Sequence, residues 1–329
     1  MFITDRGAAA PPAAARPPAP APSHPHLAAL IVQARLHGSI AMAVAYPCDA
    51  ASIEAAHAAA AADLIRPLLV GPRRRIEEAA AQAGVSIAGV VIHDTDDDPR
   101  TAAARAVALC RDGEASALMK GSLHSDDLLA AAVGRDGGLR SSRRASHVFV
   151  MDVPSVERPL LITDCVVNIA PDLAAKRDIA QNAIALAHAL GIPTPRIAIL
   201  SAVETVNPAI PATIDAAALC KMAERGQIRG ALLDGPLAFD NAISAQSART
   251  KGIESAVAGR PDVLLVPNLE AGNMIYKQLV YLAGAECAGL VLGMRVPIVL
   301  TSRSDSVASR IASCALAVLA SPRRTGIAA

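Results

Sequence analysis

Short apolar runs alternate with alanine-rich stretches along most of the chain, and this alternation limits the possible folds more than any other feature. Strand-like apolar runs lie, for example, at Met42–Tyr46 and Ile197–Ser201. Stretches such as Ala50–Leu64 and Leu173–Leu190 have the length and composition of helices. Strands that alternate with helices are typical of an α/β protein with a mostly parallel sheet. Because the strands are apolar throughout, we expect helices to cover both faces of each sheet.

The chain has 329 residues, which is enough for two domains or subdomains with a cleft between them. Its first part, from about Gly7 to Pro25, consists mainly of Ala and Pro. Such a segment can neither bury a core nor sustain a helix. We therefore expect residues 1–26 to form a disordered tail and the fold to begin near Leu27.

Composition argues against several kinds of partner. Lys and Arg (31) nearly balance Asp and Glu (30), so the net charge of +1 gives no reason to expect nucleic acid or an anionic membrane surface. Aromatic residues make up only 2% and Trp is absent, which disfavours base stacking. The apolar runs are too short to span a bilayer, and no leucine-rich signal segment is present. Six scattered cysteines without metal-ligand spacing indicate free thiols, no metal site and a cytoplasmic protein.

Polar residues follow many of the expected strands. In open α/β sheets ligands bind beyond the carboxyl ends of the strands, so we expect these residues to lie at one edge and to contain the site. Asn273 and Lys277 lie one helical turn apart and are further candidates, although they could also be a surface pair. The candidates at strand ends are Lys120 and Gly121 with His124 nearby, Asp164, Asp234, and Ser302 with Arg303.

The segment Thr301–Ser306 has the features of an active-site loop. It follows an apolar run at Ile298–Leu300 and precedes a helical pattern for which Ser306 is a suitable N-cap. A helix start supplies N–H donors and a positive dipole end, which suit phosphate or a developing anion. Ser302 adds a hydroxyl donor, Arg303 a fixed charge and Asp305 a possible proton acceptor. An ordinary capped helix with a surface arginine is the alternative.

Arg140 and Arg143 lie in a segment rich in Gly and Ser, where guanidinium groups could bind phosphoryl oxygens or simply face solvent. Asp164 and Asp234 are more typical of residues that organise strand ends through hydrogen bonds than of catalysts. The sequence contains no G-x-G-x-x-G, no G-x-x-x-x-G-K-[ST], no H-E-x-x-H and no G-x-S-x-G. These absences weaken nucleotide-binding, zinc-protease and serine-hydrolase interpretations.

From about Ala117 to Leu319 the chain resembles the phosphate acetyltransferase and phosphate butyryltransferase family, and more closely its butyryl branch. The resemblance rests on many motifs in the family's order. They are Lys120-Gly121 with His124, Gly138-Leu139-Arg140 with Arg143 and Ser146-His147-Val148, Thr163-Asp164 through Asn168-Ile169-Ala170-Pro171-Asp172, Ala271-Gly272-Asn273 with Tyr276-Lys277, and PIVLTSRSDS at 297–306.

This resemblance implies reversible transfer of a short acyl group between coenzyme A and inorganic phosphate, without metal, bound cofactor or covalent acyl-enzyme. It implies an α/β fold like that of isocitrate and isopropylmalate dehydrogenases, with two subdomains flanking a cleft, in a homodimer. We expect residues 27–146 with 304–329 in one subdomain and 147–303 in the other. Arg140 and Arg143 would then bind coenzyme A or phosphate. Lys120, Gly121, His124, Asp164, Asp234, Asn273 and Lys277 would line the substrate site.

The resemblance also assigns roles in the loop. Ser302 matches the serine that stabilises the reacting carbonyl, and Arg303 matches the arginine that binds phosphate. The acetyl branch has an aspartate base seven residues after this serine, where this chain has Ser309. We therefore take Asp305 as the substitute base, with an orienting role as the alternative. Two other functions stay open, a metal-dependent NAD oxidoreductase of the same fold and a catalytically silent regulatory homologue.

Overall fold

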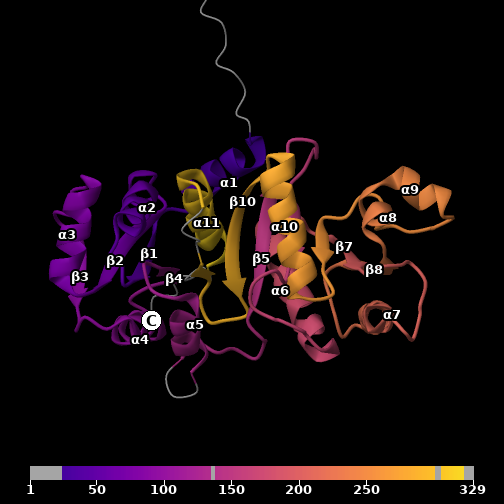
Figure 1. Ribbon diagram of the computed structural model, residues 1–329, viewed down its shortest axis with the longest axis horizontal. Coiled ribbons are helices and arrows are strands. Elements are labelled where there is room, and N and C mark those ends of the chain that lie inside the picture. The colour runs from indigo at the N-terminus through magenta and orange to yellow at the C-terminus, as the bar shows by residue number, and fades with distance from the viewer. Residues whose placement is uncertain (1–23, 135–137, 301–304, 322–329) are drawn as a thin grey trace, which may run out of the picture.

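The computed structural model describes residues 24–134, 138–300 and 305–321 of the chain. Its strands form one sheet of eleven, in the order β3-β2-β1-β4-β11-β10-β5-β6-β9-β7-β8. In Figure 1 this sheet runs across the whole molecule, from β3 on the left to β8 on the right. The predicted α/β class with a mostly parallel sheet is confirmed.

The sheet consists of two parallel blocks that two antiparallel strands join. The first block contains β1 (Ile40–Ala45), β2 (Ile65–Gly71), β3 (Val91–Asp94), β4 (Ala117–Lys120) and β11 (Ile298–Val299). The second contains β6 (Leu160–Thr163), β7 (Arg196–Leu200), β8 (Leu232–Leu237) and β9 (Val263–Leu265). Between them, β10 (Glu286–Leu292) is antiparallel to β11, and β5 (Ser146–Asp152) is antiparallel to both β10 and β6.

Strand direction reverses three times between the blocks, so the two blocks point in opposite directions. Their carboxyl ends therefore lie at opposite edges of the sheet. The expectation that all polar strand ends share one edge is wrong, because apolar periodicity identifies a strand without giving its direction.

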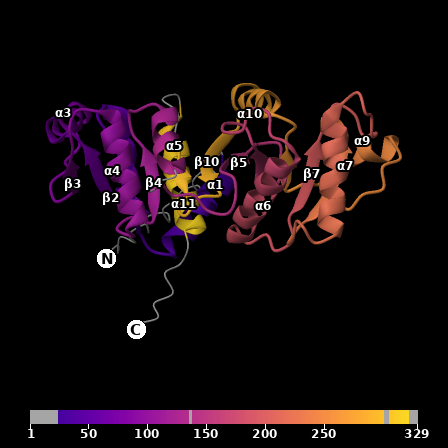
Figure 2. The same cartoon turned by 90° about the horizontal axis from the view of Figure 1, so that it is seen from below.

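Helices cover both faces, but the two faces are packed differently. One face has a continuous core under α1 (Pro25–Arg35), α2 (Ala50–Ala61), α3 (Arg73–Ala83), α6 (Leu173–Ala189), α7 (Pro211–Glu224) and α11 (Val307–Ala320). The other face has two separate cores. The first lies under α4 (Pro99–Arg111) and α5 (Ser125–Val133), and the second under α8 (Phe239–Ile243) and α10 (Leu269–Ala283). The short helix α9 (Ala245–Thr250) follows α8. Figure 2 shows α10 and α6 on opposite sides of the sheet.

The interruption between those two cores lies over the antiparallel strands. On β10, Val291 belongs to the core under α5, whereas Cys287 belongs to the core that α10 packs against. Gly289, between them, has no side chain to fill the gap. The two cores thus meet over β10, where His147 and Phe149 pack closely against Gly289.

Short polar side chains set where the helices begin. Asp49, Asp172 and Asn268 accept hydrogen bonds from the N–H groups three residues later, at the starts of α2, α6 and α10. Ser306 does the same for α11, which confirms it as the predicted N-cap. Because Asn268 is the cap, α10 begins at Leu269.

The described fold begins with α1, whose N-terminus is bound to the end of β5. The N–H groups of His26 and Leu27 donate to Oδ2 of the buried Asp152 at 2.8 and 3.0 Å. Pro25 and His26, which were expected in the disordered tail 1–26, are therefore helical, and His26 has a tertiary contact. The rest of the expected tail, residues 1–23, lies outside the described residues. Within 24–134, 138–300 and 305–321, none of the helices combines the length and apolarity that crossing a bilayer would need.

Candidate functional site

The central residues of this face, between α5 and α10, come from four neighbouring strands. Register places Leu118, Ile298, Val291 and His147 in one row across β4, β11, β10 and β5. Two residues further along, and so on the same face, lie Lys120 on β4 and Phe149 on β5. Gly289 lies beside His147 and Phe149, and a Cβ there would come within 2.7 Å of His147 Nε2. These residues form the floor of the candidate site.

Lys120 and Gly121 end β4 at one side of this floor. Lys120 Nζ donates to the carbonyl oxygens of Gly121 and Leu123 at 3.1 and 3.3 Å. A Cβ on Gly121 would lie 2.4 Å from the carbonyl oxygen of Ala45, so only glycine allows the ends of β1 and β4 to approach this closely. His124 is exposed at the start of α5, where its side chain makes no capping bond.

The predicted catalytic loop continues from β11. Ser302 and Arg303 lie outside the described residues, so their positions are not part of the geometry. Asp305 is half-buried and lines a cavity of about 130 Å³ together with Tyr276, Cys287, Ser306 and Ser309. The predicted base thus lies beside the N-terminus of α11 and near the upper part of α10.

A second carboxylate in this cavity was missed by the sequence analysis. Glu286, the first residue of β10, lines the same cavity. Its Oε2 accepts hydrogen bonds from Ser306 Oγ at 3.0 Å and from Ser309 Oγ at 2.7 Å. Nothing local in the sequence marks a single Glu at the start of a strand, and only its contact with a residue 23 positions later shows its place.

Three arginines at the lower side of the floor form a cluster, defined here as Arg140, Arg143 and Arg144. They line a cavity of about 310 Å³ with Asn168, and Arg143 also lines a neighbouring cavity of about 340 Å³. Arg140 and Arg143 are exposed. Such a concentration of guanidinium groups suits phosphoryl oxygens.

Asp164 supports this cluster from behind. Its carboxylate accepts from the N–H groups of Val166 and Val167 and from the Asn168 amide at 2.6 Å. Asn168 Oδ1 in turn accepts from Arg144 Nε at 2.5 Å. Asp164 is buried and organises the turn after β6, so its contacts match the organising role expected from the sequence.

Helix α10 forms a wall of the site, on the side of the floor away from Lys120. Tyr276 stacks on Phe149 with ring centroids 4.1 Å apart, and Asn273 Nδ2 lies 3.5 Å from the carbonyl oxygen of Cys165. Lys277 is exposed one turn further along. Cys165 is fully buried, and burial raises the pKa of its thiol, so a reactive thiolate is disfavoured there.

Asp234 is placed apart from the other candidates. It lies on β8 at the outer edge of the sheet, four strands away from β5, and accepts a hydrogen bond from the Gly235 N–H. Its predicted role in the substrate site stays a prediction.

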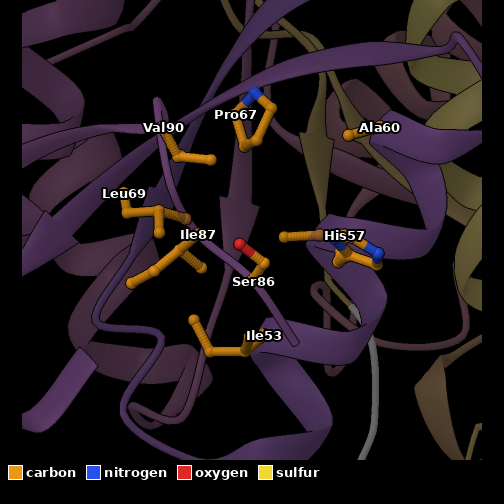
Figure 3. Close-up of a pocket in the computed structure, with 9 residues that line it drawn as sticks. Ile53, His57, Ala60, Pro67, Leu69, Ser86, Ile87 and Val90 are labelled. Carbon is orange, nitrogen blue, oxygen red and sulfur yellow. The ribbon is translucent and has the colours of Figure 1, made fainter. Parts of the chain in front are cut away.

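Another cavity, between α2 and β2, lies at the far end of the sheet (Figure 3). Mainly apolar side chains line it, including Ile53, Leu69 and Val90, with His57 and Ser86 as polar exceptions. It has no lysine or arginine in its lining, so it does not suit a phosphorylated substrate. In the described ranges, no group of three or more His, Cys, Asp or Glu side chains is placed to hold a metal ion.

Comparisons with known proteins agree with this chemistry. The family model described as phosphate acetyl/butaryl transferase matches residues 98–318. A phosphate acetyltransferase of Rhizobium meliloti is 56% identical over 295 residues, which cover 90% of this chain and 93% of the relative. A probable phosphate butyryltransferase of Bacillus subtilis (strain 168) is 43% identical, covering 90% of this chain and 98% of the relative.

A solved structure shows the same architecture. The branched-chain phosphotransacylase from Enterococcus faecalis V583 is 28% identical, with a TM-score of 0.74 and coverage of 85% of this chain and 98% of that chain. The names of these relatives include acetyl, butyryl and branched-chain acyl groups, so they do not select one acyl length.

Proposed function

This chain belongs to the phosphate acetyl/butyryl transferase family, and on that premise we propose that it transfers a short acyl group reversibly between coenzyme A and inorganic phosphate. The observation that carries the proposal is the family match over residues 98–318. This range includes the whole floor, the arginine cluster and α10. The relatives favour this reaction over the NAD oxidoreductase that the sequence left open.

We assign the two ends of coenzyme A to the two sides of the floor. The arginine cluster is suited to the phosphates, whereas the thiol would reach the loop that follows β11. β5 and β10 run between these two regions, and a strand of seven residues spans roughly 20 Å. An elongated substrate with charge at one end and a thiol at the other fits this arrangement.

The chemical step needs no residue to become acylated. The thiol sulfur attacks the carbonyl carbon of the acyl phosphate, the C–S bond forms, and phosphate leaves with the electrons of the C–O bond. We assign Ser302 to the carbonyl oxygen that becomes negative, Arg303 to the phosphate, and Asp305 to the thiol proton. The buried Cys165, with its raised pKa, makes a covalent route less favourable.

We also propose a homodimer in the cytoplasm, with residues 27–146 and 304–329 in one subdomain and 147–303 in the other. Exposed apolar side chains on α10, namely Met274, Tyr281 and Leu282, support self-association. Sedimentation of the purified protein at the mass of two chains is expected, and a concentration-independent monomer would contradict the dimer.

The function is tested by phosphate-dependent release of coenzyme A from acyl-CoA thioesters of increasing chain length. We expect release only with phosphate present, with a preference for acyl groups of three to five carbons or a broad preference. Strict acetyl preference would contradict the expected chain length, and the absence of release with every thioester would contradict the function itself.

A further inference from the structure

Arg144 is the residue of the arginine cluster that the fold holds in the most defined way. Its Nε donates to Asn168 Oδ1 at 2.5 Å, and its backbone N–H donates to Asp178 Oδ2 at 3.0 Å. Its carbonyl oxygen accepts from Asn182 Nδ2 at 2.9 Å. Asp178 and Asn182 lie one turn apart on α6, so this helix fixes the backbone of Arg144 while the turn after β6 fixes the side chain.

The residue that follows β10 is also fitted to this arrangement. Gly293 has a φ of +78°, and a Cβ there would lie 2.3 Å from the carbonyl oxygen of Arg144 and 2.6 Å from Asn182 Nδ2. Only glycine combines this backbone conformation with such a close approach. A larger residue would push α6 and the Arg144 backbone apart.

Asn168 has a fixed orientation of its own. It is buried, and its Nδ2 donates to Asp164 Oδ2 at 2.6 Å and to the carbonyl oxygen of Ala145 at 2.9 Å. An amide nitrogen has two hydrogens, and both are used here, so the amide oxygen is left to face Arg144. Because the amide is neutral, it orients the guanidinium group without cancelling its charge.

The guanidinium group of Arg144 keeps open donors at its outer end. The bond to Asn168 uses the Nε hydrogen, which leaves four hydrogens on the two terminal nitrogens. Within residues 24–134, 138–300 and 305–321, neither terminal nitrogen has a hydrogen-bond or ion-pair partner. Arg144 is exposed and lines the cavity of about 310 Å³. Two parallel N–H donors at this end match two oxygens of a phosphoryl group.

The other two arginines of the cluster are less ordered by their surroundings. Arg140 and Arg143 line the same cavity, but in the described part of the chain their guanidinium groups contact no acceptor. They must lose rotamer freedom when they bind a ligand. A guanidinium group that is already oriented loses less, so Arg144 should contribute more to binding.

We propose that Arg144 is a substrate-binding residue that fixes a phosphoryl group of coenzyme A, and that Asn168 is the positioning residue that orients it. This inference rests on the proposed acyl transfer. The cavity of Arg144 includes Met294, beyond the end of β10, whereas Glu286 at the start of β10 lines the cavity of Asp305. A strand of seven residues, roughly 20 Å, separates the two. The phosphate that reacts must lie near the acyl carbon, so the group at Arg144 belongs to the distant part of coenzyme A.

The test measures coenzyme A binding by calorimetry and steady-state kinetics in Arg144→Lys, Arg143→Lys and the control Arg249→Lys on α9. Lysine keeps the charge of Arg144 but cannot bond Asn168 and also present two parallel donors. Arg144→Lys should weaken coenzyme A binding and raise KM for acyl-CoA roughly 10–100-fold. Its kcat, its KM for inorganic phosphate and its melting temperature should stay the same, because the contact is equal in the ground and transition states. Arg143→Lys should show a clearly smaller loss, and Arg249→Lys none.

The role of Asn168 is tested by a double-mutant cycle. Asn168→Ala should weaken coenzyme A binding by itself but add nothing to Arg144→Lys, because it acts through that guanidinium group. Additive losses would overturn the positioning role. If Asn168→Ala does not fold, Asn168→Ser, which keeps an oxygen at this position, replaces it in the cycle.

Unchanged coenzyme A binding in Arg144→Lys would overturn the inference, and so would an equal loss in Arg143→Lys. A rise in KM for inorganic phosphate alone would also overturn it, since the phosphoryl group at Arg144 would then be the reacting one. Binding of coenzyme A without any turnover in the wild-type protein would instead contradict the proposed function.

Discussion

Single side chains determine the charge balance of the site. Arg303 is assigned to phosphate because a guanidinium group presents two parallel donors that match two phosphoryl oxygens. Lysine keeps the charge but loses this geometry. The variant Arg303→Lys should therefore lower kcat/KM for phosphate strongly while the free energy of unfolding stays the same. Arg249→Lys on the exposed face of α9 is the matched control. Near wild-type kinetics in Arg303→Lys would move the phosphate site to Arg140 and Arg143.

Substitution to amides distinguishes the roles of Asp305 and Glu286, the two carboxylates near α11. Asp305→Asn should reduce kcat by roughly 10²–10⁴-fold, the range of a lost general base. Glu286→Gln should reduce it far less, because the amide oxygen can still accept from Ser306 and Ser309. Steady-state kinetics of both variants decide the matter. A larger loss in Glu286→Gln would transfer the role of proton acceptor to Glu286.

His147 also gives stability a dependence on pH. Burial lowers its pKa to about 4 in the folded protein, compared with about 6.5 in an unfolded chain, so the unfolded state takes up a proton first as pH falls. The free energy of unfolding should thus decrease from about pH 6.5 down to pH 4, by about 3 kcal/mol in total, and be unaffected above this window. Urea unfolding across pH should show a shallower decrease in His147→Phe. Parallel curves for the two proteins would show that the histidine is not buried as a neutral ring.

At the scale of elements, the start of α11 connects the catalytic loop to the fold. Ser306 accepts from the Ser309 N–H at 3.0 Å, and Ser244 makes the same kind of bond at the start of α9. Each serine-to-alanine change should cost roughly 1 kcal/mol of stability. Only Ser306→Ala should also lower kcat/KM, because Asp305 precedes it directly. Equal activity in Ser306→Ala and Ser244→Ala would separate the loop from the helix cap.

Sequence periodicity located most elements but not their arrangement. The predicted helix Leu173–Leu190 is observed at Leu173–Ala189, since its alanine-rich pattern and Asp172 cap are local signals. The helix Pro25–Arg35 was not predicted, because its first turn is stabilised by Asp152, more than 120 residues away. The three reversals of strand direction leave no local signal. They depend on which strands pair, which the whole chain decides.

For the whole molecule, the antiparallel pair β5 and β10 has the main effect on the site. It separates the two parallel blocks and leaves the floor between α5 and α10, where His147 and Gly289 lie. Motifs predicted that Lys120, Asp164 and the arginines serve one site. The bond from Arg144 to Asn168 and the bonds from Ser306 and Ser309 to Glu286 were not predicted, because they join residues far apart along the chain.

The central claim is direct acyl transfer between coenzyme A and phosphate while both are bound. Initial rates measured over a matrix of acyl-CoA and phosphate concentrations test it most directly. Direct transfer in a ternary complex predicts reciprocal plots that intersect, with no release of coenzyme A when phosphate is omitted. Parallel lines, with acyl label trapped on the protein, would contradict the account and require a covalent acyl-enzyme.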